Sequence, residues 1–510
     1  MSSTIFLAVL FTVLVPTFLT IIMNRKHEQN RLPPGPRKLP FIGNLHQLGQ
    51  FPHRSLQCLS RRHGPLMFLQ LGSVPTLVVS SAAMAKETCK THDLVFSSRP
   101  SLCALNKLGY KSSTITFAPY AEYWRQVRKI AVVELLRVKR VQSFKAIREQ
   151  EVAFMIEKVA NSSSSLINLS ELMLLLANNI VLRVVFSMKG SNYGEKNVKS
   201  EFDEILHETQ DLLGMVNIAD YLPWMGWFNK LNGVEARLGK NFRELDSFYD
   251  RAIQEHRECP RKARKDEHED LVDVLLRVQT APNQDIALTD DQIKAVLTDM
   301  FIAGTDTSAA TLAWTMSELI KKPSVMKKTQ EEVRGIVKGK GAFVQERGLP
   351  KLEYLPMIIK EALRLHPPVP LLLPRETTET RVIGGYEIPA KTRVFINATA
   401  ISLDPELWDD PENSSIDFRG QHFELLPFGA GRRGCPGTNF AVLTVELALA
   451  NLLLSFDWRL PDRMNADDVD MEDAVGLTVH NKAPLCLVVS SHISSHAYAS
   501  GEASNAIEWK

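Results

Sequence analysis

The chain has 510 residues, with 60 Lys and Arg set against 58 Asp and Glu. With 45% hydrophobic and 23% charged residues it has the composition of a globular protein, which excludes a wholly disordered chain, a collagen-like fibre and a polytopic membrane protein. The balanced charge gives no support for nucleic-acid binding, which usually requires a basic excess. The six cysteines are scattered without a CxxC pair, so we expect neither a disulfide scaffold nor a zinc module.

An uncharged apolar segment occupies residues 5–23. At about 1.5 Å per residue, a helix of this length approaches the ~30 Å hydrocarbon core of a bilayer. Arg25 and Lys26 follow at once and no basic residue precedes the segment, so the positive-inside rule places the following chain in the cytosol. A cleaved signal peptide is the alternative, but its basic start and small-residue cleavage motif are missing. We therefore expect a membrane anchor over residues 1–24, in contact with the lipid bilayer through residues 5–23.

A proline-rich stretch at residues 32–36, with Pro40 beyond it, follows the apolar segment. Proline fixes φ and restricts the residue before it. Residues 25–40 are therefore predicted to be a stiff, extended, basic connector. It serves either as a plain linker or as a hinge that sets the angle between the membrane and the body of the protein.

Residues 41–489 are predicted to form one large body, mainly α with a smaller β-rich part. The clearest helix is expected over residues 290–321, because Thr289 and Gln292 form a capping-box pair and Pro323 ends the pattern. Strands are predicted within residues 65–79, 380–396 and 484–489, a solvated loop at residues 255–270, and a disordered tail over residues 490–510.

A glycine-dense segment runs from Pro427 to Gly437 and contains Cys435. Glycines allow the backbone to approach a flat ligand closely. Backbone N–H groups and the positive end of the helix predicted at residues 441–454 can stabilise a thiolate here, and Arg433 can face an anionic group. These are the conditions for a metal-bound thiolate, so Cys435 is predicted to be a metal ligand.

The pattern of this segment resembles the haem-binding loop of the cytochrome P450 family, whose fixed positions fall here on Phe428, Gly431, Arg433, Cys435 and Gly437. The resemblance implies a haem b cofactor with an axial thiolate from Cys435. It also implies the cytochrome P450 fold, here preceded by a transmembrane helix.

A second motif lies inside the predicted long helix, where Ala303, Gly304, Asp306 and Thr307 resemble the oxygen-activation motif of the family. Gly304 leaves room for dioxygen, and Asp306 and Thr307 can organise water and pass protons. A solvent-facing kink is the alternative, which fits poorly because the flanking helix face is apolar.

Further matches concern structural and cofactor-binding residues. Glu361 and Arg364 share a helix face and resemble the structural Glu–Arg pair of the family. Trp124 and Arg128 also share a face, and with Arg375 they match positions that contact the haem propionates. Without the other motifs, a core Trp beside a surface Arg would be the simpler interpretation.

The resemblance covers residues 32 to about 489 and is strongest to the large plant seventy-one group. It implies a monooxygenase of the endoplasmic reticulum membrane that uses O2 and electrons from an NADPH–cytochrome P450 reductase. Its substrates would be small molecules such as terpenoids, phenolics, alkaloids or oximes. By the same resemblance the substrate pocket is apolar and suits a lipophilic molecule, and it draws on Leu102, Ile115, Leu213, Phe301, Val369, Leu373, Leu477 and Thr478. Residues 223–228 contain two tryptophans that either meet the membrane interface or pack in the core.

The chain departs from the family in one place. A Phe-x-Pro-Glu-Arg-Phe block is expected soon after Trp408 and Pro411, but Glu412 leads directly into an unrelated stretch. The Arg of that block normally completes the network of Glu361 and Arg364, and Arg419 is the one nearby replacement. Two alternatives to a monooxygenase therefore stay open: a haem-thiolate isomerase or dehydratase that needs no reductase, and a non-catalytic haem protein.

Overall fold

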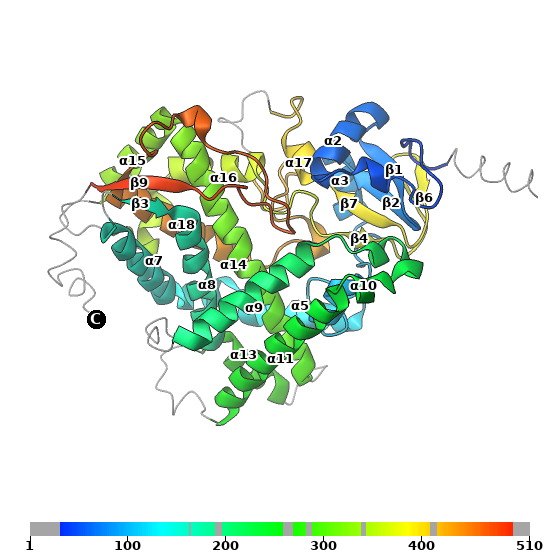
Figure 1. Ribbon diagram of the computed structural model, residues 1–510, viewed down its shortest axis with the longest axis horizontal. Coiled ribbons are helices and arrows are strands. Elements are labelled where there is room, and N and C mark those ends of the chain that lie inside the picture. The colour runs from blue at the N-terminus through cyan, green and yellow to red at the C-terminus, as the bar shows by residue number, and fades with distance from the viewer. Residues whose placement is uncertain are drawn as a thin grey trace, which may run out of the picture.

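The computed structural model describes residues 31–162, 165–188, 196–258, 269–281, 288–337, 343–408 and 416–492, with the side chains of residues 196–203 left aside. The predicted membrane anchor, the first part of the connector and the tail beyond residue 492 lie outside the described residues. The described chain is mainly helical with a few short strands, as predicted, with the largest sheet at one end and most helices at the other (Figure 1).

The α-helices account for about half of the described chain. They are α2 (Pro52–His63), α3 (Ala82–Lys86), α4 (Cys103–Leu108), α5 (Glu122–Ile130), α6 (Val138–Ser143), α7 (Lys145–Ala160), α8 (Leu169–Phe186), α9 (Lys196–Gly214), α10 (Phe228–Leu231), α11 (Val234–Glu258), α13 (Leu271–Thr280), α14 (Asp290–Lys321), α15 (Pro323–Ile336), α16 (Tyr354–Leu365), α17 (Ala398–Ser402) and α18 (Thr438–Ser455).

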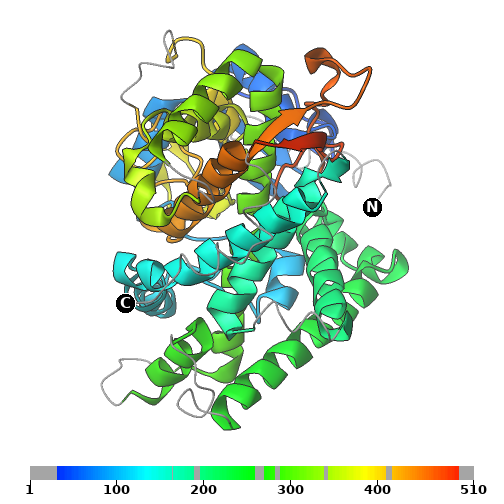
Figure 2. The same ribbon diagram turned by 90° about the vertical axis from the view of Figure 1, so that its left-hand side faces the viewer.

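The strands lie in the three predicted regions and also at three further short sites. They are β1 (Leu66–Leu71), β2 (Val74–Val79), β3 (Leu166–Asn168), β4 (Arg375–Glu376), β5 (Arg381–Ile383), β6 (Tyr386–Ile388), β7 (Arg393–Ile396), β8 (Phe456–Arg459) and β9 (Cys486–Ser491). One sheet has the order β1-β2-β7-β4, in which only β2 and β7 are parallel. A second has the order β3-β9-β8. Its strand β8 follows α18 directly, and β8 and β9 are orange to red in Figure 2. The hairpin β5–β6 turns at Gly384 and Gly385, both with positive φ.

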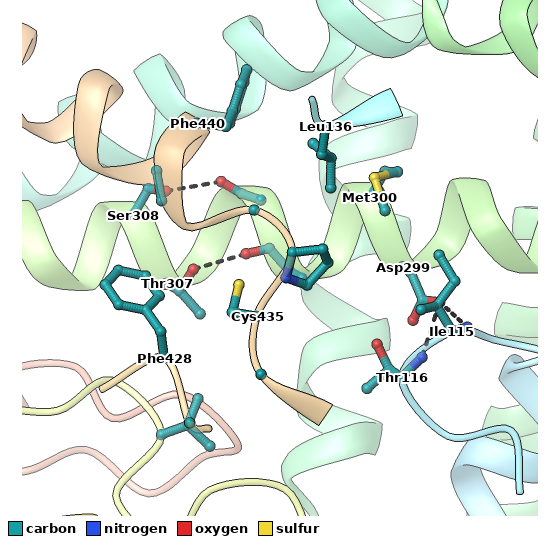
Figure 3. Close-up of a pocket in the computed structure, with 18 of the residues that line it drawn as sticks. Ile115, Thr116, Leu136, Asp299, Met300, Thr307, Ser308, Phe428, Cys435 and Phe440 are labelled. Carbon is teal, nitrogen blue, oxygen red and sulfur yellow. Dashed lines mark hydrogen bonds between the residues drawn. The ribbon is translucent and has the colours of Figure 1, made fainter. Parts of the chain in front are cut away.

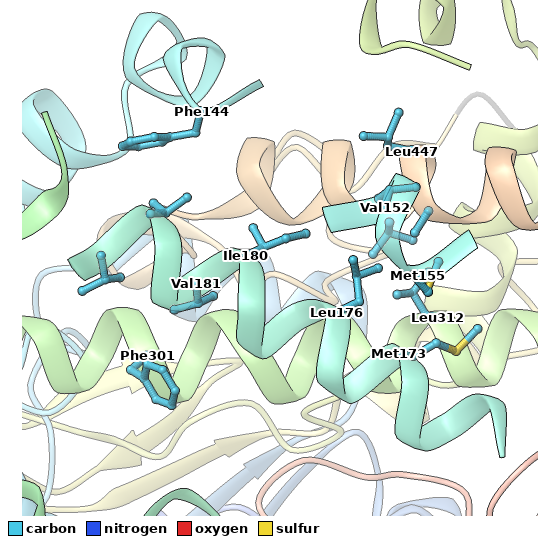
Figure 4. Packing of buried hydrophobic residues seen from close by; sticks show 14 of the residues in the cluster. Phe144, Val152, Met155, Met173, Leu176, Ile180, Val181, Phe301, Leu312 and Leu447 are labelled. Carbon is cyan, nitrogen blue, oxygen red and sulfur yellow. The ribbon is translucent and has the colours of Figure 1, made fainter. Parts of the chain in front are cut away.

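Helix α14 has the predicted bounds, because its N-terminal signal is local. The Thr289 hydroxyl accepts the Gln292 N–H, and the Gln292 side chain accepts the Thr289 N–H at 2.9 Å. Most of α14 is buried, and it packs along α8, where Val181 faces it (Figure 4). This pairing places α14 in the interior, where its face can line a cavity.

Among the described helices, α8 and α18 are long and apolar enough to cross a membrane, and 61% of each such window is buried inside the body. Helix α8 packs against α7 and α14, and α18 packs against α7, α14 and α15. Their apolar character is therefore accounted for by burial in the core.

The described part of the connector, residues 31–40, runs extended along β1 as predicted. The Pro34 carbonyl accepts the Phe68 N–H at 3.0 Å. A Cβ at Gly35 would lie 2.1 Å from the Phe68 carbonyl oxygen, so only glycine allows this approach.

Two boundaries differ from the expectation. Helix α11 continues to Glu258, so residues 255–258 are helical rather than a solvated loop. The reason is His256, which is buried and bonds the Ala252 carbonyl at 2.6 Å and the Asp270 carboxylate at 2.8 Å. At the other end β9 continues to Ser491, two residues past 489, because Ser490 and Ser491 pair with β8.

Candidate active site

An internal cavity lies between α14 and the glycine-dense loop, and it is lined mainly by apolar side chains. Its volume is about 270 Å³. Cys435 and Phe428 from the loop face Thr307 and Ser308 of α14 across it (Figure 3). The structure thus brings together two motifs that are more than a hundred residues apart in sequence.

The loop that carries Cys435 is held by its own backbone. The Cys435 N–H donates to the Phe428 carbonyl at 2.9 Å. Gly431 has φ +70°, and a Cβ there would lie 2.2 Å from the Cys89 carbonyl oxygen. Gly437 directly precedes α18, so the positive end of an 18-residue helix begins beside the sulfur. These contacts present the thiol to the cavity.

The environment of the sulfur has two opposing effects on its pKa. Burial raises the pKa of the Cys435 thiol, while hydrogen bonds from the Gly437 N–H and from Thr438, together with the charge of Arg128, lower it. The exposed surface of Cys435 faces the cavity, and protein surrounds the sulfur on its other sides. A cation bound in the cavity would keep such a thiol deprotonated.

One face of α14 forms the opposite wall of the cavity and contains Ala303, Gly304, Thr307 and Ser308. The Thr307 hydroxyl donates to the Ala303 carbonyl at 2.8 Å, and the Ser308 hydroxyl to the Gly304 carbonyl at 3.1 Å. Helix α14 remains α-helical here, so these bonds satisfy the polar groups without a kink. A Cβ at Gly304 would lie 3.0 Å from a methyl group of Val181, so this glycine also lets α8 approach.

Asp306 lies outside the cavity lining, although sequence reasoning grouped it with Thr307. Its Oδ1 is 2.7 Å from Nε2 of His480, and its side chain is 14% exposed. His480 was missed because it lies 174 positions away and carries no local signal.

Four arginines from separate elements line one end of the cavity: Arg99, Arg128, Arg375 and Arg433. Arg433 donates to the carbonyls of Ser97 at 2.7 Å and Ala118 at 2.6 Å, and Arg375 donates to the Ala430 carbonyl at 2.8 Å. Arg128 donates to the Gly434 carbonyl. Sequence reasoning missed Arg99, which donates to the carbonyls of Thr116, Leu373 and Pro374.

Trp124 also lines the cavity, and it helps to hold Arg433. Its indole N–H donates to the Ile115 carbonyl at 2.8 Å, and the guanidinium of Arg433 lies 4.1 Å from the centre of the Trp124 ring. This stacking fixes the guanidinium plane at the cavity wall.

The arginines make this end of the cavity electropositive. Burial lowers the pKa of Arg433 to about 9, with Arg375 and Arg128 as further causes, and burial also lowers the pKa of Arg99 well below its usual value. Of these arginines, Arg375 pairs with a buried carboxylate, that of Asp93, at 3.3 Å. A flat ligand with two carboxylates, such as haem, would supply the negative charge that these groups lack, so the residues present fit that cofactor.

A second carboxyl group, missed by sequence reasoning, lies in the cavity wall one turn before Ala303. Asp299 accepts the Ile115 N–H at 2.5 Å and the Thr116 N–H at 3.3 Å (Figure 3). Burial raises the pKa of Asp299 to about 7, although these hydrogen bonds and Arg433 oppose the shift. Asp299 thereby connects α14 to the loop of Ile115, whose carbonyl accepts hydrogen bonds from Trp124 and Arg433.

The pair Glu361 and Arg364 is bidentate, with distances of 2.8 and 2.7 Å, and both lie on α16. Arg364 also donates to the Ser402 carbonyl at 2.8 Å and lies over the Trp408 ring at 5.0 Å. Arg419 pairs with Asp417 at 3.4 Å on the surface and is therefore no replacement for the missing Arg. Residues 409–415, where the missing block was expected, lie outside the described residues.

Three of the expected substrate-contacting residues, Ile115, Val369 and Leu373, line the cavity. Phe301 is buried in the core on another face of α14, and Leu213 packs beside α4 and α11. Leu102, Leu477 and Thr478 also lie outside the lining. Side chains that sequence reasoning did not name complete the apolar wall: Leu136, Phe144, Val184, Met300 and Phe440.

Comparisons with known proteins agree with this site. Residues 33–487 match a family model described as Cytochrome P450. The chain is 54% identical to strychnine-11-hydroxylase of Strychnos nux-vomica over 94% of this chain and 96% of the relative, and 56% identical to cytochrome P450 71A9 of Glycine max over 95% and 97%. It is 46% identical to the phenylacetaldehyde oxime monooxygenase CYP71AN24 of Prunus mume over 91% and 90%. A zebra fish cytochrome P450 solved with abiraterone shares the fold, with a TM-score of 0.72 and 24% identity over 86% of this chain and 99% of that chain.

Proposed function

The chain belongs to the cytochrome P450 monooxygenase family, and from that premise we propose that it is a membrane-anchored, haem-thiolate enzyme of plant specialised metabolism. It inserts one oxygen atom of O2 into a lipophilic small molecule, with electrons that pass from NADPH through a cytochrome P450 reductase. The observation that carries the proposal is the position of the Cys435 sulfur, which faces Thr307 across a mainly apolar cavity.

Each wall of the cavity has a task in this proposal. Cys435 would ligate the iron, and Arg128, Arg375 and Arg433 would hold the two propionates, with the Trp124 ring against Arg433. When bound, the haem supplies oxygen activation, and thiolate donation favours O–O cleavage. Thr307 holds a proton at its Oγ1 on the cavity wall, where the hydroxyl donates to the Ala303 carbonyl at 2.8 Å.

The apolar wall supports a lipophilic substrate and excludes water. Val184, Met300, Val369, Leu372 and Leu373 offer no charge to a ligand, so recognition depends on shape and apolar contact. The similarity to relatives named for a strychnine hydroxylase and an oxime monooxygenase supports a plant alkaloid or oxime as substrate class.

An exposed apolar surface supports attachment to the endoplasmic reticulum membrane in addition to the predicted anchor. The Ile42 carbonyl accepts the Gly72 N–H at 3.1 Å, and the Tyr221 carbonyl accepts the Ser73 N–H at 2.8 Å. These bonds bring the start of the described chain beside the segment between α9 and α11. Large apolar side chains of the two segments are exposed, namely Leu39, Phe41, Ile42, Val216, Trp224, Trp227 and Leu231.

The decisive experiment is the absorption spectrum of the reduced, carbon-monoxide-bound protein. The wild type should show the red-shifted Soret band of a thiolate ligand, and Cys435→Ser should lose it. Cys58→Ser is the matched control, since Cys58 is an exposed cysteine outside the site. A histidine-type band in the wild type would overturn the proposal.

One observation keeps the isomerase or dehydratase in view: the Asp306 carboxylate is directed to His480 and lies outside the cavity lining. Turnover of an oxime or a peroxide without NADPH, at the rate seen with reductase and NADPH, would favour that alternative. Product formation that requires both O2 and the reductase would exclude it. A non-catalytic protein would show neither.

A further inference from the structure

Asp93 is a buried carboxylate behind the loop of Cys435 and is outside every motif identified in the sequence. Only 4% of the residue is exposed. Its Oδ2 accepts the backbone N–H of Arg432 at 2.9 Å and the Arg432 guanidinium at 3.0 Å. Its Oδ1 accepts Arg375 at 3.3 Å, and the Ser97 hydroxyl donates to the Asp93 backbone carbonyl. One carboxylate therefore bonds both the cysteine loop and a cavity arginine.

The loop has no room to move relative to Asp93. A Cβ at Gly431 would lie 2.7 Å from Asp93 Oδ1 and 2.2 Å from the Cys89 carbonyl oxygen. Glycine at this position is thus required by the approach of the 87–93 segment as well as by its positive φ. Cys435 lies four residues farther along the loop, so the position of Asp93 constrains the direction in which the sulfur points.

Arg375 closes the arrangement from the other side. Its Nη2 donates to the Ala430 carbonyl at 2.8 Å while its Nη1 contacts Asp93. The guanidinium is 4% exposed, and the cavity around it also contains Arg99, Arg128 and Arg433. Asp93 therefore offsets part of a buried positive charge that would otherwise be uncompensated.

We propose that Asp93 is a positioning residue for the haem: it fixes Arg375 and the Cys435 loop in one arrangement, and its negative charge lowers the reduction potential of the bound iron. This inference rests on the proposed haem-thiolate function. The direction follows from electrostatics, because an electron is added less readily near a negative charge and more readily near an uncompensated arginine. The contacts to Arg432 and Arg375 also oppose opening of the loop, which slows haem loss.

The test uses the full-length holoprotein with Asp93→Asn, which keeps an acceptor oxygen but removes the charge. We expect haem transfer to apomyoglobin to become at least tenfold faster and the reduction potential, measured by redox titration, to become more positive. Asp473→Asn is the matched control. Asp473 is equally buried and pairs with His53 at 3.0 Å and Arg54 at 2.7 Å, but lies outside the cavity lining. Its loss should lower stability and leave the potential unchanged.

A double-mutant cycle separates positioning from general destabilisation. In an Arg375→Gln background, Asp93→Asn should change haem loss and potential by much less than it does alone, because the two residues act through one contact. If Asp93→Asn fails to fold, Arg432→Gln removes one bond to Asp93 while the backbone donor stays, and haem loss should still accelerate. Unchanged haem loss in that variant counts against the inference.

The outcomes distinguish this inference from the proposed function. If Asp93→Asn keeps the potential and the haem-loss rate of the wild type, and the thiolate band is present, the role of Asp93 is wrong and the function stands. If the wild type itself lacks the thiolate band, the proposed function and this inference fall together.

Discussion

His480 binds the Asp306 carboxylate from outside the cavity, with 2.7 Å between Nε2 and Oδ1. The same short segment lies along α14 at two further points. The Trp314 indole donates to the Val479 carbonyl at 2.9 Å, and the Asn481 amide donates to the Ser317 hydroxyl at 3.3 Å. The segment thus holds the acid of the oxygen-activation motif in a position that the helix alone does not impose.

We expect His480→Phe to lower the fraction of NADPH that ends in product by at least twofold, because Asp306 loses its donor and its orientation. His480→Gln should retain most of the coupling, since its amide N–H can still reach Asp306. The measurement is product and hydrogen peroxide formed per NADPH consumed with reductase. Wild-type coupling in His480→Phe would show that the contact is only structural.

Thr307→Ala should separate NADPH consumption from product formation. The Thr307 hydroxyl is a polar group of α14 that faces Cys435, and its loss removes the proton held at that point. Thr307→Ser keeps an oxygen at the same place and should behave nearly as the wild type. Peroxide release is the readout, and equal coupling in all three proteins would contradict the role assigned to Thr307.

The raised pKa of Asp299 predicts that the stability of the protein depends on pH. Its pKa is about 7 in the folded protein, against about 3.9 in an unfolded chain, so between about pH 4 and pH 7 the folded state binds more protons. The free energy of unfolding from this group therefore falls as pH rises through that range. Asp299→Asn should remove this slope. The contribution of Asp299 lowers the denaturation midpoint of the wild type from pH 5 to pH 7.5, and the variant should lack that decrease.

Asp290→Asn is the control for this measurement. Its hydrogen bond with Arg257 lowers the pKa of Asp290 to about 2, so Asp290 is almost fully charged in both states between pH 5 and pH 7.5. Its replacement should change stability equally at pH 5 and pH 7.5. A wild-type slope that survives in Asp299→Asn would assign the pH dependence to another group.

Gly431→Ala should abolish haem loading, because the added Cβ would lie 2.2 Å from a backbone oxygen that cannot move aside. Gly429→Ala is a matched control in the same loop. Gly429 also has positive φ, +65°, but its Cβ would meet only Leu372 at 3.8 Å. It should cost about 1 kcal/mol of backbone strain and retain haem. The ratio of haem absorbance to protein measures both, and full loading of Gly431→Ala would contradict the loop geometry.

Sequence reasoning succeeded where a signal is local. The bounds of α14 follow from a capping box and a proline. The loop of Cys435 follows from its glycines, two of which adopt the positive φ that glycine favours. It failed where distant segments meet. The roles of three residues depend on partners on other elements, namely Asp93, Asp299 and His480. A single Asp or His in the sequence carries no motif that would reveal such a partner. Phe301 shows a further limit: its neighbour Met300 lines the cavity, so a rotation by a fraction of a helical turn decides between a cavity wall and the core.

The extended connector along β1 has a consequence for aggregation. Strand β1 is the outermost strand of its sheet, and such a strand exposes unpaired N–H and C=O groups to any second chain. Here Pro34 accepts the Phe68 N–H, and Asn44 bonds both the N–H and the carbonyl of Gln70. Residues 34–44 thus cover the edge of β1. In a shortened protein that begins beyond Asn44, this edge would be exposed and could pair with a second chain. Shortened forms for crystallisation should therefore keep the prolines.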